Sequence, residues 1–292
     1  MDSVVLLHVL AAQWRAMPNA FSLSALHVHH GISPHADRWA AFCADYARRL
    51  GVPCTCAHVE VERGSKDGLE AAARRARHAV FADTDADWIM LAHQRDDQAE
   101  TLLFNLLRGT GIAGAAAMRE CSGRLLRPLL TTDRSEIERY ANAHRLEWCD
   151  DESNADVRHS RNFLRHRILA PLSQRFPAAA KNLAAAAARF AEAQDLLDAL
   201  ARLDLGEDSG GFPLSLNKLR SLDEPRARNI LRYLLAQRAV PIPSEARLRE
   251  ALRQMLDARP DRHPALVLGA YRLLRRRDRI YLEPVDASID RR

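Results

Sequence analysis

87-DWIMLAHQRDDQAET-101 joins an apolar stretch of strand type to the start of a helix. The strand ends at His93, and the helix begins with Asp96, Asp97 and Glu100. Open α/β sheets bind ligands where strands end, and the i,i+3 and i,i+4 spacings place Glu100 on the same helix face as both aspartates. Converging carboxylates are costly unless a cation compensates them, so the segment predicts a site for Mg²⁺ or an ammonium group. The alternative is solvated acids that only complement the helix dipole.

Strands and helices alternate on both sides of this segment. We expect helices over 4–14, 34–50, 69–81 and 96–107, with Ser33 as the N-cap of the second, and strands over 21–28, 52–61 and 87–93. Alternation of this kind produces crossover units, so the predicted fold class is α/β with a parallel, doubly wound sheet. Such a sheet normally begins with a strand, and we therefore expect a central first strand upstream of Met1.

The pattern beyond Arg127 is mostly helical. Helices are expected over 135–146 and 161–172, followed by an alanine-rich helix to about Leu205 and the linker 206-GEDSGGFP-213. The last 80 residues or so predict a small, mainly helical second domain that closes with two strands around 273-LLRRRDRIYLEP-284.

Charge and cysteine content narrow the class of protein. Residues 206–292 carry 18 basic and 12 acidic side chains, a net charge of +6, whereas the preceding part has a net charge of −1. A basic appendage fits a polyanion partner, although a solvated arginine-rich surface has the same composition. Five cysteines without a C-x-x-C motif indicate neither a disulfide framework nor a zinc knuckle. The apolar stretch 4–12 is too short to cross a bilayer, so we expect a cytoplasmic protein with no membrane partner.

Two further motifs indicate a function less clearly. The spacing in 109-GTGIAG-114 is that of dinucleotide-binding loops, but it follows a helix, which excludes a Rossmann dehydrogenase and leaves a loop beside a site. The histidines of 27-HVHHGISPH-35 are compatible with a strand end near a nucleotide, with packing or with a metal; neighbouring strand residues point to opposite faces.

An arginine-rich segment follows the acidic stretch 150-DDESN-154. Arg158, Arg161 and Arg165 fall on one stripe of an expected helix, an arrangement suited to phosphates. A helix that only forms salt bridges is the alternative.

Taken together, these segments resemble the tRNA(Ile)-lysidine synthetase family, within the pyrophosphatase-loop ATP-dependent enzymes. The matching pieces are HVHHGIS, LEAAARRAR, LAHQRDDQAET, LLRGTGIAGAAAM, LRPLL, and DESN followed by RNFLR; they occur in the family's order over most of residues 1–176. Residues 214–284 are similar, more weakly, to the family's small second domain. The resemblance implies an adenine-nucleotide alpha-hydrolase-like fold, with an ATP-pyrophosphatase domain at 1–190, a helix end and linker at 191–213, and a small substrate- and tRNA-binding domain at 214–285.

The resemblance also implies an activity, namely ATP-dependent ligation of free L-lysine to the wobble cytidine of an isoleucine tRNA with a CAU anticodon. ATP, with Mg²⁺, adenylates the C2 carbonyl oxygen and pyrophosphate leaves. The lysine side-chain amine then attacks C2 and expels AMP.

Site roles carried over from the family's motifs fall into three groups. Catalytic roles fall on Asp97 and Glu100, which would hold the lysine, and on Arg108, which would neutralise the α-phosphate or AMP. The resemblance assigns the binding of ATP and Mg²⁺ to Asp2, Ser3, His29, His93 and Asp96. Of these, Asp2 and Asp96 would coordinate the metal. The nucleotide or tRNA side receives Asn154, Arg161 and Arg165.

The family's nucleotide loop has the pattern Ser-Gly-Gly-x-Asp-Ser, and Met1-Asp2-Ser3 corresponds to its last three positions. We therefore expect that the chain as written lacks Ser-Gly-Gly and the strand before it. Removing one donor from such a loop costs roughly 10²–10³ in rate, so we expect this chain to be inactive or poorly folded and an upstream-extended one to be active. Many members continue into a further C-terminal domain while others are short, and we expect this chain to stop before such a domain.

Three alternatives stay open at this point. A related tRNA thiolase would share the sheet but would need cysteine pairs, for which Cys54-Thr-Cys56 is a poor substitute. A small-molecule amide ligase would not need the basic appendage. A non-catalytic RNA-binding remnant would bind tRNA with a steep salt dependence and release no pyrophosphate.

Overall fold

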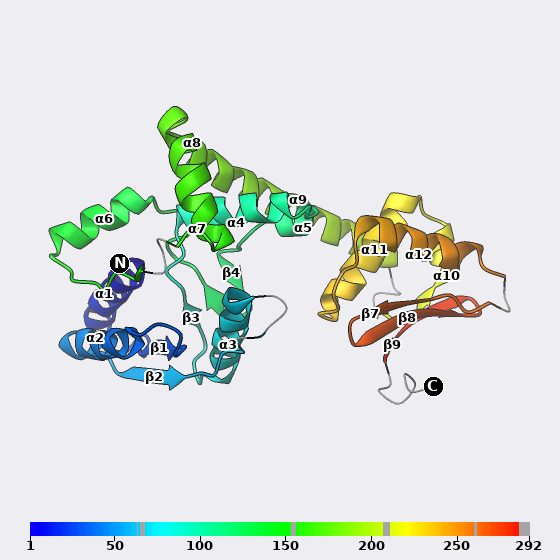
Figure 1. The fold of residues 1–292 in the computed structure, drawn as a ribbon. Coiled ribbons are helices and arrows are strands. Elements are labelled where there is room, and N and C mark those ends of the chain that lie inside the picture. Colours follow the sequence, from blue (N-terminus) through cyan, green and yellow to red (C-terminus); the bar gives the residue numbers. More distant parts are fainter. Residues whose placement is uncertain (63, 65–67, 153–155, 207–210, 260–261, 286–292) are drawn as a thin grey trace. The chain divides into compact units, whose positions relative to one another are not determined.

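Helices and strands alternate along the first part of the chain in the computed structural model, which describes all residues except 63, 65–67, 153–155, 207–210, 260–261 and 286–292 (Figure 1). The chain divides into unit 1, Met1–Ala191, and unit 2, Glu192–Arg292, and the boundary falls inside helix α9 (Ala179–Leu205). Of the helices that the structure describes, none is long and apolar enough to cross a bilayer.

Unit 1 contains the elements expected around the acidic segment. Its order is α1 (Asp2–Ala16), β1 (Ala25–His29), α2 (Ala36–Arg49), β2 (Cys54–His58), α3 (Leu69–Asp83), β3 (Ile89–Met90), α4 (Arg95–Leu107), α5 (Ile112–Ala115), β4 (Cys121–Ser122), β5 (Leu125–Leu126), α6 (Arg134–Ala143), α7 (Ser160–Phe163), a π-helical segment (Leu164–Leu169) and α8 (Ala170–Arg175).

The expected parallel sheet is present as two small sheets. Strand β1 pairs with β2 in parallel, and β3 pairs with β5 in parallel. Strand β4 adds an antiparallel edge to β5, joined by a tight turn in which Gly123 has φ +56°, a conformation that favours glycine. Among the described residues, no strand pairs with both β1 and β3, so the sheet is not continuous.

Two local predictions in unit 1 were wrong. Helix α2 begins at Ala36 with His35 at the N-cap, because the Ser33 hydroxyl accepts a hydrogen bond from the His35 amide (3.1 Å) and builds the turn before the helix. Arg158 precedes α7 and pairs with Asp156 (2.7 Å), so it does not share a helical stripe with Arg161.

The core of unit 1 consists of small clusters. In one, Leu102 of α4 packs with Ala115 of α5 and Ala187 of α9. In another, Val5 of α1 packs with residues of α6. The first of these clusters holds α4, the helix that carries the acidic segment, against its neighbours.

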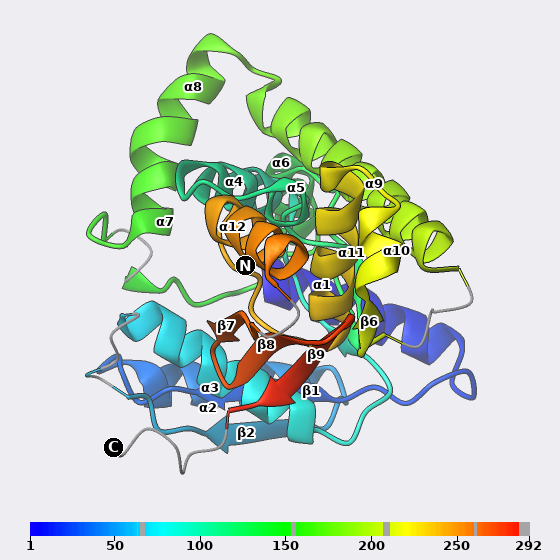
Figure 2. The ribbon, with the colours of Figure 1, turned by 90° about the vertical axis from the view of Figure 1, so that its right-hand side faces the viewer.

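In unit 2, the helices that follow α9 pack on one face of an antiparallel sheet (Figure 2). The helices are α10 (Leu216–Arg220), α11 (Glu224–Gln237) and α12 (Glu245–Asp257), and the sheet order is β6 (Leu214–Ser215), β9 (Arg279–Pro284), β8 (Tyr271–Arg276), β7 (Ala265–Leu268). The sheet has four strands where the sequence predicted two, because β6 and β7 are too short to show a clear alternation. A continuous apolar core, including the fully buried Leu231 and Leu252, lies between the layers.

Candidate active site in unit 1

The acidic segment lies directly after β3, where the chain turns into α4. The Leu91 amide still donates to the Leu126 carbonyl (2.8 Å), and the buried Gln94 then caps the helix. The Gln94 side-chain oxygen accepts a hydrogen bond from the Asp96 backbone amide (2.8 Å), and the Gln94 backbone amide donates one to Asp97 Oδ2 (3.0 Å). This reciprocal cap fixes the orientation of Asp97 at the helix start.

Arg165, from the π-helical segment, joins Asp97 to Glu100. Its Nη2 lies 2.9 Å from Asp97 Oδ1 and 3.0 Å from Glu100 Oε2, and its Nε lies 2.5 Å from Glu100 Oε1. Glu100 is only 3% exposed. Burial raises the pKa of Glu100, and the hydrogen bonds from Arg165 oppose that shift.

Asp2 and Asp96 complete a group that we call the acidic cluster: Asp2, Asp96, Asp97 and Glu100. Burial raises the pKa of Asp2; the chain's amino group opposes the shift and Asp97 adds to it. Its Oδ1 is buried and has no hydrogen-bond partner among the described residues. Burial also raises the pKa of Asp96, with Arg134 opposing. Ser3 lies on the same turn as Asp2 and is exposed.

The carboxylates of the acidic cluster are the side chains that could hold the Mg²⁺ implied by the family resemblance. Magnesium is usually held by one or two carboxylates together with substrate phosphates and water. The buried, unpartnered Oδ1 of Asp2 fits such a role, and the carboxylate whose charge acts most on Asp2 is Asp97 rather than Asp96. Within the part of the chain that the structure describes, no three His, Cys, Asp or Glu side chains are arranged to hold a metal by themselves.

The charge of Asp97 in the acidic cluster and the charges of a second group both act on His93; we call that second group, Arg74, Arg77 and Arg127, the arginine cluster. Burial lowers the pKa of His93 to about 4; Asp97 opposes the shift and all three arginines reinforce it. His93 is therefore neutral near pH 7. Its Nδ1 is buried without a partner among the described residues.

The two histidines at the end of β1 have different surroundings. The contacts of the buried His29 are with Asp37 (Nε2 to Oδ1, 3.0 Å) and with the His58 ring at 4.4 Å, so the structure does not bring it to the acidic cluster. His30 has other surroundings: its Nδ1 is buried and unpartnered among the described residues, and burial followed by the charge of Arg77 lowers its pKa. Strand alternation was the signal that could have selected His30 over His29.

Arg108 and Arg161 flank one aromatic ring. Their guanidinium carbons lie 5.2 and 5.9 Å from the Phe104 ring centre, and Arg161 Nε lies 3.4 Å from Glu70 Oε1. Arg108 follows the end of α4, about 18 Å along the helix axis from Asp96 at 1.5 Å per residue. The structure therefore groups Arg108 with Arg161 and groups Arg165 with the acidic cluster. Asn154, also predicted for this site, lies outside the described residues.

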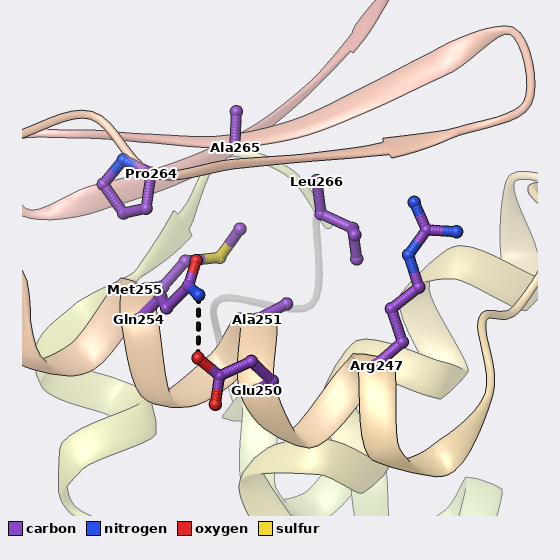
Figure 3. Close-up of a pocket in the computed structure, with 8 residues that line it drawn as sticks. All are labelled: Arg247, Glu250, Ala251, Gln254, Met255, Pro264, Ala265 and Leu266. Atoms are coloured by element: carbon purple, nitrogen blue, oxygen red, sulfur yellow. Dashed lines mark hydrogen bonds between the residues drawn. The ribbon is translucent and has the colours of Figure 1, made fainter.

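A separate cavity of about 150 Å³ lies in unit 2 between α12 and β7 (Figure 3). Gln254 donates to Glu250 across its helical wall (2.7 Å), and Leu266 lines the strand side. None of the residues predicted from the sequence to be functional lines this cavity. The candidate chemistry therefore lies in unit 1.

Comparison with known families fits this geometry. The PP-loop domain matches residues 1–172, which include both clusters, and the TilS substrate binding domain matches residues 214–281. Among solved structures, the U34-tRNA thiolase NcsA from Methanococcus maripaludis, with its [4Fe-4S] cluster, is similar with a TM-score of 0.53 at 16% identity, over 65% of this chain and 68% of that chain. That likeness shows the shared fold.

Relatives in sequence cover nearly the whole chain. The tRNA(Ile)-lysidine synthase of Nitrosomonas europaea is 43% identical over 98% of this chain, and that of Aromatoleum aromaticum is 46% identical over 97%. The chain spans 64% and 66% of the lengths of these relatives. With a PP-loop domain followed by a TilS substrate binding domain, the chain belongs to the tRNA(Ile)-lysidine synthase family.

Proposed function

We propose that this chain carries the catalytic part of an ATP-dependent lysidine-forming ligase. Its substrates would be ATP with Mg²⁺, free L-lysine and an isoleucine tRNA with a CAU anticodon. ATP transfers its adenylyl group to the C2 oxygen of the wobble cytidine, with release of pyrophosphate. The lysine side-chain amine then forms the C2–N bond, loses a proton, and AMP leaves with the oxygen.

The observation that carries this proposal is the acidic cluster at the end of β3. Its four carboxylates exceed the charge of Arg165, and each oxygen of Asp97 accepts one hydrogen bond among the described residues, although a carboxylate oxygen can accept two. The cluster therefore retains capacity for a further cation, either the ammonium group of lysine or Mg²⁺. The names of the sequence relatives support the choice of lysine.

Individual residues then have distinct tasks. Asp97 and Glu100 would hold the lysine amine, which has a pKa of roughly 10.4 in water and must lose a proton before it attacks. Asp2, with Asp96 or Asp97, would hold Mg²⁺, which neutralises charge on the phosphates when bound. Neutral His93 would donate or accept one hydrogen bond between the two clusters. The wobble base is in a single-stranded loop, so extruding it costs little.

The split sheet is consistent with a ligand at this place. We infer that β1–β2 and β3–β5 are two halves of one doubly wound sheet, whose switch point lies between β1 and β3. Ligands bind in such sheets beyond the carboxyl ends of the strands at the switch point. His30 follows β1 and His93 follows β3, so both stand at those ends.

The proposal is tested by nucleoside analysis of the tRNA product. The longest open-reading-frame product that contains these 292 residues is incubated with ATP, Mg²⁺, lysine and an isoleucine tRNA transcript, and the tRNA is digested for mass spectrometry. We expect one cytidine to gain the mass of a lysine less one water, only when all substrates are present. Arg75→Gln, an exposed change on α3, is the matched control and should leave the yield unchanged.

Other products would identify the alternatives. Replacement of a nucleoside oxygen by sulfur would indicate a thiolase. Release of AMP with lysine but without tRNA would indicate a small-molecule ligase. Binding of tRNA without any AMP release would indicate a non-catalytic RNA-binding protein.

A further inference from the structure

Two helices contribute the acidic cluster, and α6 contacts both of them. Asp2 stands in the first turn of α1, whereas the other three carboxylates stand in the first two turns of α4. Ile137 of α6 packs in one apolar cluster with Val5, one turn after Asp2. On the next turn of α1, His8 Nδ1 lies 2.9 Å from the Tyr140 hydroxyl oxygen of α6. The start of α1 is therefore held by α6.

Arg95, the first residue of α4, connects that helix to α6. Its Nη1 pairs with Asp133 Oδ1, and its Nη2 donates to the Thr131 carbonyl. Its backbone amide donates to the Thr132 carbonyl (3.2 Å). The Arg95 side chain is only 18% exposed, and its partners lie 36 and 38 positions further along the chain. One residue therefore fixes the segment 131–133 at the start of α4.

Asp133 is also the N-cap of α6. Its amide donates to Glu136 Oε2 (3.0 Å), and its side chain accepts in return from the Glu136 amide, which makes a capping box. Isolated surface ion pairs contribute little, because holding two mobile side chains in one geometry costs entropy. The pair of Arg95 and Asp133 differs, since the guanidinium also binds a main-chain carbonyl and the carboxylate also caps a helix. Both of its ends are held in place.

The effect of Arg95 on the acidic cluster is positional. Burial raises the pKa of Asp2 and of Asp96, and the arginines that oppose this shift most are Arg134 and Arg165. Arg95 is not one of these opposing charges, although it precedes Asp96 in the chain. Arg134 is the first residue of α6, so the contact of Arg95 with this helix start also places that cation.

We propose that Arg95 is a positioning residue that holds the start of α6 against the start of α4 through Asp133. Because α6 in turn holds α1, this contact sets how Asp2 faces the carboxylates of α4. The inference rests on the proposed function, in which these carboxylates receive a cation. Contacts that support metal-binding side chains typically contribute about 10–100-fold to metal affinity.

The first test measures the contact itself, by hydrogen exchange and mass spectrometry on the longest open-reading-frame product. Arg95→Met and Asp133→Asn should both speed exchange in peptides that cover 134–143, because the start of α6 loses its partner on α4. Asparagine also caps helices, so Asp133→Asn removes the ion pair and keeps an N-cap. Unchanged exchange over 134–143 in both variants would overturn the proposal.

The second test measures Mn²⁺ binding, from the electron paramagnetic resonance signal of the free ion, without ATP or tRNA. We expect Arg95→Met to weaken binding by about tenfold. Arg95→Lys, which keeps the charge but loses the two-pronged contact, should weaken it by less. The double variant with Asp133→Asn should bind no more weakly than Arg95→Met alone, because both changes remove the same contact.

Arg49→Met is the matched control. Arg49 Nη1 lies 3.1 Å from Glu147 Oε2, in another ion pair between distant parts of unit 1, but this pair reaches the segment after α6. Its loss should leave the affinity for Mn²⁺ unchanged. An equal loss of affinity in Arg49→Met would overturn the assignment of this role to Arg95.

The Tm of each variant separates positioning from stability. A purely structural role for Arg95 predicts a lower Tm with an unchanged Mn²⁺ affinity of the folded molecules, and that result would overturn the proposal. Absence of Mn²⁺ binding in the wild type would instead contradict the metal role in the proposed function. In that case the exchange over 134–143 decides whether Arg95 positions α6.

Discussion

Two buried arginines, one in each unit, differ in how their donors are satisfied. Arg275 in unit 2 is 4% exposed, and its donors bind the carbonyls of Met255 (2.7 Å), Ala258 (2.8 Å) and Arg277 (2.8 Å). Arg127 in unit 1 is 6% exposed, yet its Nε has no partner among the described residues.

This difference in satisfied donors distinguishes an arginine that stabilises the fold from one that can bind a ligand. Two of the Arg275 contacts satisfy carbonyls at the end of α12, which is what a helix C-terminus needs. Arg127 instead has a buried, unpartnered Nε, and no carboxylate among the described residues acts on its charge, an arrangement that costs stability unless a ligand supplies an anion. The account therefore assigns Arg275 to folding and Arg127 to binding.

The largest expected effect is on the first chemical step. Arg127→Met removes a buried cation that, on the hypothesis that it faces the phosphates of ATP, acts in this step, and losing one such donor typically costs roughly 10²–10³ in rate. We expect tRNA-dependent pyrophosphate release to fall by that factor in the longest open-reading-frame product. Arg275→Met serves as the control. If the rate of pyrophosphate release per folded molecule falls equally in Arg275→Met, the distinction between the two arginines is lost.

The next effect is on stability, with the roles reversed. Arg275→Met leaves two helix-end carbonyls without donors and should cost about 2–3 kcal/mol in unit 2. Arg127→Met loses one hydrogen bond but also an uncompensated charge, so the free energy of unfolding of unit 1 should change by less than about 1 kcal/mol. Urea unfolding followed by circular dichroism measures the first change.

Tryptophan fluorescence provides the internal control for that experiment. All four tryptophans, Trp14, Trp39, Trp88 and Trp148, lie in unit 1. Their transition should therefore be insensitive to Arg275→Met. A large destabilisation of unit 1 by Arg127→Met would show that Arg127 serves the fold.

The smallest effect is a pH dependence through His93. Its folded pKa of about 4 lies below the ordinary value of 6.5, so between these pH values the unfolded chain binds a proton that the folded site does not. Its contribution makes unit 1 less stable as the pH falls from 6.5 towards 4. His93→Gln should reduce this loss, as measured by urea unfolding at pH 6.5 and 4.5.

Other groups require a matched control in that measurement. The raised pKa values of Asp2, Asp96 and Glu100 change the pH dependence of stability with the opposite sign. These carboxylates are present in both the wild type and the His93→Gln variant. His166→Gln, an exposed change in unit 1, should behave as the wild type. An identical pH dependence in His93→Gln would contradict the burial of a neutral histidine between the clusters.

Sequence patterns predicted the long elements of unit 1 and the acidic segment, because strand–helix alternation and i,i+3/i+4 spacing are local properties. They did not predict the division of the sheet, since β3, β4 and β5 pair over two residues each and leave little periodic signal. They assigned Arg165 to the nucleotide or tRNA side, which stays a prediction, and they could not show its bonds to Asp97 and Glu100, which are more than 60 positions away in the chain.

The arginine cluster was missed for the same physical reason. Arg74 and Arg77 look like ordinary surface arginines of an amphipathic helix, and only the fold brings the distant Arg127 towards Arg74. The motif LEAAARRAR contributed to the family resemblance without revealing what its arginines face. Convergence of distant cations has no signature in spacing.

The most direct test of the two-cluster account separates the two chemical steps. In the longest open-reading-frame product, Glu100→Gln should leave tRNA-dependent pyrophosphate release without lysine near the wild-type rate and should strongly raise the KM for lysine in the second step. Arg127→Met should slow the first step. If Glu100→Gln slows pyrophosphate release as much as Arg127→Met does, or leaves the KM for lysine unchanged, the assignment of lysine to the acidic cluster is contradicted.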